Sequence, residues 1–124
     1  MLCVRDHRSL VAWSEARRVT TIALRVSRTQ WKPWAAEVFR QLQRSALSIQ
    51  LNIAEGHALG DRGRFANHLA IAYGSATETT ELFQVGLEEK IFEEDIALEG
   101  IARSRCCERL LLGLLKKYRE RPER

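Results

Sequence analysis

The sequence predicts an all-α protein, an antiparallel up-down four-helix bundle. Apolar residues recur at helical spacing in four long segments. The 124 residues include two prolines and seven glycines, few enough for long uninterrupted helices. No segment has the pattern of a β-strand. The length fits one domain, so we expect a single domain over residues 1–124. Apolar types make up 45% and charged types 29%, which excludes a collagen-like or disordered chain.

We expect the helices at residues 9–28, 34–58, 62–90 and 93–118. Ser9 is suited to cap the first helix, and Asp61 to cap the third. Pro33 disfavours helix at the residue before it and opens the second helix. Trp31 and Trp34 flank this proline and are expected to seal one end of the bundle. Short connections between helices of this length place consecutive helices antiparallel.

The third and first helices differ in the width of their apolar faces. In the third, apolar and small residues from Phe65 to Leu87 form one stripe with glutamates opposite. In the first, apolar residues from Val11 to Val26 spread over about 220° of arc, whereas a core-facing stripe needs little more than 100°. We therefore expect the first helix to pack against another subunit in a homo-oligomer.

Hydropathy and cysteine content indicate a cytoplasmic protein. The longest uncharged run, residues 65–77, is too short for a membrane-spanning helix, which needs about 20 residues. Charged residues follow the first four residues, so we expect neither a signal peptide nor a membrane partner. The cysteines are Cys3 and the adjacent Cys106 and Cys107. An odd number with a vicinal pair makes a poor disulfide framework and favours reduced thiols.

Charge is divided along the chain, whose formal net charge is +4. Residues 1–50 hold nine basic and three acidic side chains, residues 51–100 three and ten, and residues 101–124 eight and three. Two helix faces gather the basic residues: Arg17, Arg18, Arg25 and Arg28 on the first, and Arg105, Arg109, Lys116 and Arg119 on the fourth. One interpretation is that these stripes are solvated faces, or that they meet the acidic third helix within one subunit or between subunits. The other is that they form an electrostatic footprint for RNA or DNA phosphates.

Motifs for catalysis are not found, and we expect no enzyme activity, no metal and no cofactor. A di-metal bundle needs Glu-x-x-His pairs, and the sequence has none. His57, His68 and Asp61 match no metal-ligand spacing, so the histidines are expected at the surface. The Gly-rich residues 56–63 match neither a Walker A loop nor a dinucleotide fingerprint. Cys106 and Cys107 are expected to be small hydrophobic residues.

One pair of segments is distinctive. Residues 41–56 read QLQRSALSIQLNIAEG, and residues 65–78 read FANHLAIAYGSATE. This pair resembles the bacterial four-helix-bundle family of 23S rRNA intervening-sequence proteins, in which a helix ending N-I-A-E-G precedes one containing I-A-x-G-S. The resemblance extends over about residues 9–118 and implies an up-down bundle that assembles as a homopentamer. It brings no catalytic residue. The family is also similar to the accessory variability protein of diversity-generating retroelements, a basic pentameric barrel that works with a reverse transcriptase and RNA.

Four residues of these segments are expected to have structural roles: Asn52, Glu55, Gly56 and Gly74. A carboxylate near the negative end of a helix is poorly placed unless paired, so Glu55 should reach an N–H group of a neighbouring helix or an arginine. Asn52 should bond the adjoining turn, and Gly56 should end the helix in the left-handed conformation. Gly74 belongs to a row of small residues that would allow close approach of another helix.

Two functions from different classes remain open. The first is a ring, expected to be a pentamer, that binds RNA or DNA through the basic faces. The second is a structural or adaptor ring whose partner is an unidentified protein, with the charges used in subunit contacts.

Overall fold

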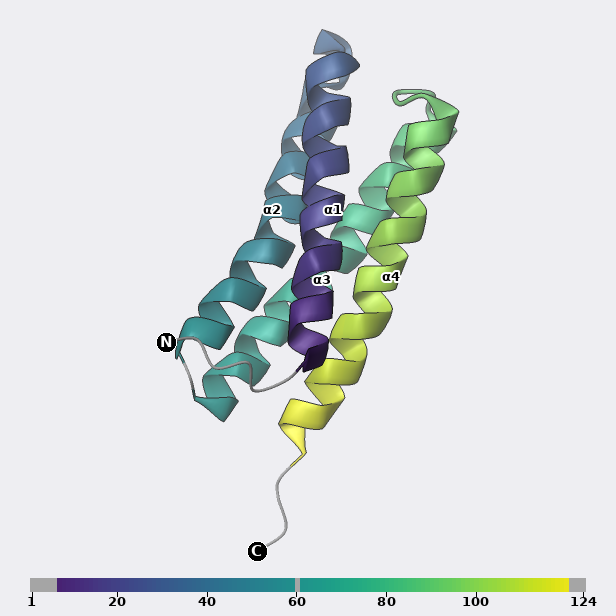
Figure 1. Cartoon of the computed structure of the whole chain (residues 1–124). Helices are drawn as coiled ribbons and strands as arrows, with labels where there is room; N and C mark the ends of the chain where they lie inside the picture. Colours follow the sequence, from purple (N-terminus) through teal and green to yellow (C-terminus); the bar gives the residue numbers. More distant parts are fainter. Residues whose placement is uncertain (1–6, 60, 121–124) are drawn as a thin grey trace, which may run out of the picture.

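The computed structural model describes residues 7–59 and 61–120 and confirms the all-α fold (Figure 1). Its elements are α1 (His7–Thr29), the 3₁₀ turn η1 (Pro33–Ala35), α2 (Ala36–Leu59), α3 (Arg62–Glu88) and α4 (Glu94–Arg119). Each helix lies within a few residues of its expected range. Because α1 begins at His7, Ser9 lies inside its first turn instead of capping it.

Each helix packs against two neighbours: α1 and α3 both contact α2 and α4. The helices run up and down in turn, so the start of α1, the α2–α3 connection and the end of α4 lie at one end of the bundle (Figure 1). The α1–α2 and α3–α4 connections lie at the other end. In Figure 1, α1 and α4 are in front, with α2 and α3 behind them.

Aromatic rings lie at the two ends of the core, and buried alanines alternate with larger aliphatic side chains between them. At one end the rings of Phe39 and Phe83 pack edge-on against Phe92, with centroids 5.3 and 6.0 Å away. At the other end Phe65 packs against Tyr118 at 4.8 Å. Fully buried alanines lie between them, at positions 16, 46, 72 and 76. Small side chains let the four helices approach closely there, as dense interior packing requires.

The α2–α3 connection has the expected cap. The Asp61 carboxylate accepts hydrogen bonds from the backbone N–H groups of Gly63 at 2.8 Å and Arg64 at 3.2 Å. It thereby satisfies two of the four N–H groups that a helix start leaves unpaired.

The tryptophans divide between two environments. Trp31 packs on Phe39 with ring centroids 4.9 Å apart, as a residue that covers the end of the core should. Trp34 is 70% exposed, so the expectation that it also seals the bundle is wrong. It lies on η1, whose buried residue is Ala35, and its own ring is turned outward.

Helix hydropathy gives no sign of a bilayer-spanning element. Within the part of the chain that the structure describes, no helix is both long and apolar enough to cross a membrane.

Candidate nucleic-acid interface

A groove between α1 and α4 gathers arginine side chains. It has a volume of about 220 Å³ and is lined by Arg17, Arg18, Thr21, Ile22, Arg25, Glu99 and Arg103. Two carboxylates neutralise part of this charge: Arg25 lies 3.5 Å from Glu99, and Glu15 lies 3.4 Å from Arg103. The Arg25–Glu99 pair is exposed and is worth about 0–1 kcal/mol, so it holds its side chains weakly. In the second pair the Glu15 side chain is 15% exposed, so this pair is better shielded from water. The groove therefore keeps a surplus of cationic groups that can turn toward an anion.

A second basic surface runs along the outer side of α4. Arg105, Arg109 and Lys116 are exposed, while Ser104, Cys107 and Leu111 of the same helix are buried. At 1.5 Å rise per residue, the first two are about 6 Å apart and Lys116 about 10 Å further on. None of the three forms an ion pair with a described residue. We call these three residues the α4 basic face.

The basic residues singled out from the sequence do not form one surface. Three arginines of α1 meet Arg103 in the groove, but Arg28 lies beside Leu24 and Gln43 on the side of α1 that faces α2. Arg119 is exposed at the last position of α4. Helical position separates Arg103 from the α4 basic face by a third of a turn or more.

Sequence reasoning missed Arg103. Its position four residues after Glu99 places both on one side of α4, which is the side that contacts α1. The spacing was visible in the sequence, but the identity of the facing helix was not. Arg62 was missed in the same way: its guanidinium lies 4.7 Å from the ring centroid of Tyr118 and donates to the carbonyl of Lys117.

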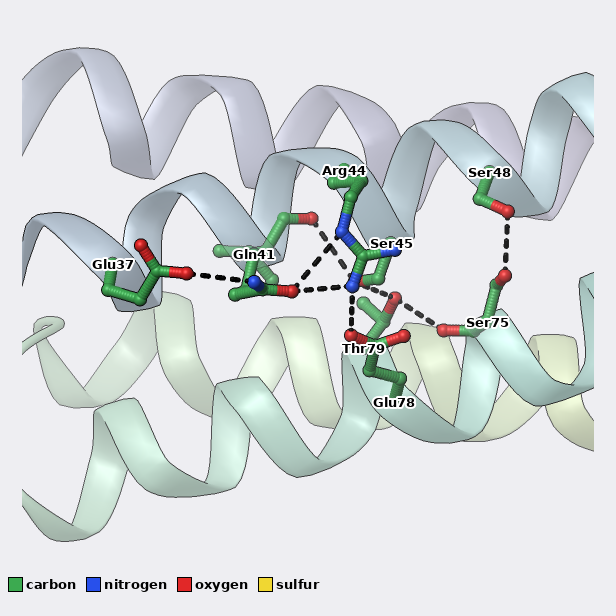
Figure 2. Close-up of polar contacts among 9 residues, drawn as sticks. Glu37, Gln41, Arg44, Ser45, Ser48, Ser75, Glu78 and Thr79 are labelled. Atoms are coloured by element: carbon green, nitrogen blue, oxygen red, sulfur yellow. Dashed lines mark hydrogen bonds and ion pairs between the residues drawn. The ribbon is translucent and has the colours of Figure 1, made fainter.

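Hydroxyl groups line the contact between α2 and α3 (Figure 2). Ser48 and Ser75 are joined by a hydrogen bond of 2.7 Å. The Thr79 hydroxyl lies 2.7 Å from both the Ser45 hydroxyl and the Ser75 carbonyl oxygen. At its exposed edge Arg44 pairs with Glu78. We call this contact the α2–α3 polar seam; it fixes the relative height of the two helices.

Asn52 and Glu55 extend the seam toward the α2–α3 turn. The Asn52 amide donates to the Ser48 carbonyl at 2.9 Å, and its oxygen lies 2.9 Å from Nδ1 of His68. Glu55 reaches the same ring nitrogen at 3.8 Å. Its partner on the neighbouring helix is thus a histidine, while Asn52 bonds that histidine and its own helix instead of the turn.

The two motif glycines differ from expectation. Helix α2 continues past Gly56 to Leu59, so the left-handed helix end expected at Gly56 is wrong. Gly56 is buried, and a Cβ atom there would lie 2.7 Å from Cβ of His68 and 2.9 Å from Cδ1 of Phe65. Close approach of α2 and α3 therefore occurs at Gly56. At Gly74 a Cβ atom would meet nothing within 4 Å, so no helix of this chain approaches closely there.

His57 is buried, contrary to the expected surface location, whereas His68 is half-buried. The His57 side chain is 6% exposed and packs edge-on against Phe65 at 5.7 Å. Neither ring nitrogen has a hydrogen-bond partner among the residues that the structure describes. It lines an apolar cleft of about 480 Å³ with Ser9, Leu10, Trp13, Ile53, Ala54 and Ala58, where α1 begins and α2 ends.

The described residues bring together no group of three or more His, Cys, Asp or Glu side chains that could hold a metal ion. Cys107 is buried and Cys106 half-buried, both as free thiols. Burial raises the pKa of Cys107 to about 12, and the negative charges of Glu15, Cys106 and Glu108 act in the same direction. A thiol with a raised pKa is a poor nucleophile at neutral pH.

The fold and these surfaces define a class of protein: a small four-helix bundle with basic residues grouped on its surface. Within this class, residues 8–113 match the model of the 23S rRNA-intervening sequence protein family. The chain belongs to this family.

The same bundle occurs in a solved structure from Bacteroides thetaiotaomicron, described as a protein with unknown function from the S23 ribosomal protein family. The two share 20% sequence identity and a TM-score of 0.77, over 88% of this chain and 98% of that chain. This likeness shows the fold. A comparison with curated proteins finds no match.

Proposed function

We propose that the chain is a non-enzymatic, nucleic-acid-binding protein that works as a closed homo-oligomer. The observation that carries the binding is that α4 contributes to two separate basic surfaces: the α1–α4 groove and the α4 basic face. Lysine and arginine side chains that neutralise phosphates release counterions, and this supplies most of the sequence-independent affinity for RNA or DNA.

The ligand of these surfaces is the phosphate backbone. The groove is lined by arginines with a threonine and an isoleucine, and the α4 basic face by two arginines and a lysine. Neither set includes an aromatic ring on which a base could stack. Binding is thus expected to be tolerant of sequence and steeply dependent on salt.

Assembly multiplies this effect. Each subunit adds a net charge of +4, and the family resemblance implies five subunits. The support within the chain is its exposed apolar surface: Leu10, Trp13, Leu24, Leu47 and Leu51 are each between 37% and 55% exposed. Apolar surface gathered in this way is typical of a protein-protein interface. The free thiols fit the reducing conditions of the cytoplasm.

The test compares two variants with the same change in charge. Arg105→Gln with Arg109→Gln alters the α4 basic face. Arg64→Gln with Lys90→Asn removes two exposed charges elsewhere, on α3 and the α3–α4 turn. Binding of a random-sequence RNA and of a DNA duplex is measured by fluorescence anisotropy between 50 and 300 mM salt.

The first variant should lower the slope of log affinity against log salt by about 1.5, because each lost phosphate contact removes roughly 0.7–0.9. The second should leave the slope unchanged. Equal effects of the two variants would contradict a defined interface. A wild-type oligomer that binds neither nucleic acid would favour an adaptor ring with a protein partner.

A further inference from the structure

One side of the bundle carries exposed apolar residues on two helices. Leu10 and Trp13 line the cleft shared with the end of α2, and Leu24 lies beside Gln43. On α2, Leu47 and Leu51 continue the stripe between Gln43 and Ala54, since positions three or four apart share a helix face. We call Leu10, Trp13, Leu24, Leu47 and Leu51 the α1–α2 apolar face.

A second, different surface lies on the outer side of α3. Ile71 is 51% exposed, Val85 is 37% exposed, and Gly74 lies between them with open space above it. Glycine inside a helix is about 1 kcal/mol less favourable than alanine. Among the described residues nothing approaches this position closely enough to require a glycine, whereas a helix from another molecule could pack closely over it. We call Ile71, Gly74, Glu81, Val85 and Glu88 the α3 outer face.

The two surfaces have opposite charge. Arg28 lies beside Leu24, Arg40 shares a helix face with Leu47, and both arginines are exposed. Of the carboxylates of these two helices, Glu15 is paired with Arg103 of α4 and Glu55 reaches His68 of α3. Glu37 bonds Gln41 and also lies 3.9 Å from Arg40, an exposed pair that offsets little of the positive charge. Two copies of the α1–α2 apolar face packed together would bring arginines into one interface. The α3 outer face brings Glu81 and Glu88 instead, both exposed.

Hydrogen bonds between the helices show that complementary residues lie at matching heights. Thr20 bonds the Ala46 carbonyl, and the α2–α3 polar seam joins Ser45 to Thr79. The position of a residue along the bundle axis, its height, can be counted from these two points because neighbouring helices are antiparallel. Trp13 of α1 lies at the height of Ile53 of α2, which is the height of Ile71 of α3.

The same count applies at the other end. Arg28 of α1 lies at the height of Val38 of α2, which is between Val85 and Glu88 of α3. In a ring whose axis runs along the bundle, residues at equal height meet.

We infer that the α1–α2 apolar face of one subunit packs head to tail on the α3 outer face of a second copy, with Ile71 entering the cleft beside Trp13. This rests on the proposed function, because it specifies how the homo-oligomer is built. Pairing of two different surfaces generates a ring if the rotation closes.

The positions of the two surfaces favour closure over a straight filament. Around the bundle, the α2–α3 polar seam lies between the two surfaces, so they do not face in opposite directions. Each added subunit is therefore rotated relative to the previous one, always in the same direction. The seam then faces the ring axis. The α1–α4 groove and the α4 basic face point outward, where a nucleic acid can reach them.

The experiment uses two glycines in equivalent surroundings. Gly74 and Gly113 are both exposed within helices, and a Cβ atom at either position would meet nothing within 4 Å. Gly74→Trp should convert the oligomer to a monomer of 14.3 kDa by light scattering. Gly113→Trp, on the outward side of α4, should leave the mass unchanged. Circular dichroism checks that both variants keep the helical content of the wild type.

A charge exchange tests the same contact without a bulky residue. Glu81→Arg with Glu88→Arg should weaken assembly at low salt, and so should Arg28→Glu with Arg40→Glu. Combining all four changes should restore it, because opposite charges face each other again. Glu89→Arg with Glu120→Arg, an equal charge change at the ends of α3 and α4, should leave the mass unchanged.

The outcomes separate the two proposals. If the wild type is an oligomer and Gly74→Trp keeps its mass, the interface is wrong while the oligomer stands. If all four charge changes together fail to restore assembly, the interface is likewise wrong. If the wild type is a monomer at every salt concentration, the closed oligomer of the proposed function fails as well.

Discussion

The close approach of α2 and α3 at Gly56 has a measurable consequence for stability. Replacing Gly56 by alanine adds one methyl group whose carbon would lie 2.7 Å from Cβ of His68 and 2.9 Å from Cδ1 of Phe65. Ordinary contacts between carbon atoms are about 3.5–4.0 Å, so one helix must shift by roughly 1 Å. Phe65 is fully buried and cannot swing away, and Cβ of His68 is fixed to the backbone.

Two effects of opposite sign then act on the free energy of unfolding. Alanine is about 1 kcal/mol more favourable than glycine inside a helix. Overpacking of a dense core is unfavourable by about 1–3 kcal/mol. We expect Gly56→Ala to be between neutral and about 2 kcal/mol less stable than the wild type.

Gly113→Ala supplies the matched control, because it makes the same substitution inside a helix where nothing lies within 4 Å. It should gain the helix preference alone, about 1 kcal/mol. The two variants should therefore differ by about 1–3 kcal/mol, or roughly 4–12 °C in Tm at about 4 °C per kcal/mol for a domain of this size. Urea unfolding and thermal melts at one subunit concentration measure the difference. Equal stabilisation by both alanines would refute the close approach of α2 and α3 at Gly56.

Two further predictions concern the cap of α3 and the buried thiol. Asp61→Ala should lower the free energy of unfolding by about 1 kcal/mol, because the N–H groups of Gly63 and Arg64 lose their acceptor; Asp61→Asn, which keeps the side-chain oxygen, should lose less in the same urea titration. The pKa of Cys107 is raised from 9.0 to about 12, so the folded chain holds this proton more tightly than the unfolded chain, and the stability it supports below pH 9 should be lost as pH rises above 9. Cys107→Ala should have a flatter profile of stability against pH above 9, and iodoacetamide at pH 9 should label Cys106 faster than Cys107 in the wild type. A Cys107 that reacts as fast as Cys106 would contradict its burial.

Local chemistry made several features predictable from the sequence. The Asp61 cap of α3 was predictable because an aspartate directly before a helical pattern is a local sequence signal for a helix start. The stripe predicted from Phe65 to Leu87 is buried through Phe83, and Leu87 at its end is half-buried. A narrow apolar face can be buried against the other helices in only one orientation, so this outcome follows from the sequence. The apolar arc of α1 is wider than the core can cover. Its alanines and Val26 are buried in the core, whereas Trp13 and Leu24 remain exposed.

Features that depend on packing between distant segments were not predictable. Gly56 followed by a Gly-containing turn has the local pattern of a helix end, yet the space it leaves is filled by Phe65 and His68 of α3. His57 was expected at the surface because nothing near it in sequence shows that Phe65 packs against it. Arg103 joins the arginines of α1 only because α1 and α4 are neighbours in the bundle, and the spacing of residues within one helix does not reveal its neighbour.

In the proposed assembly, an oligomer of this chain binds nucleic acid through an outward basic surface. The most direct measurement is the mass in solution by light scattering, at low and high salt, with and without mixed RNA. We expect an assembly near five times the 14.3 kDa of one chain, whose mass rises with RNA at low salt and returns to its starting value at high salt. A monomer under all conditions would contradict the assembly, and an oligomer whose mass RNA does not change at low salt would contradict the binding.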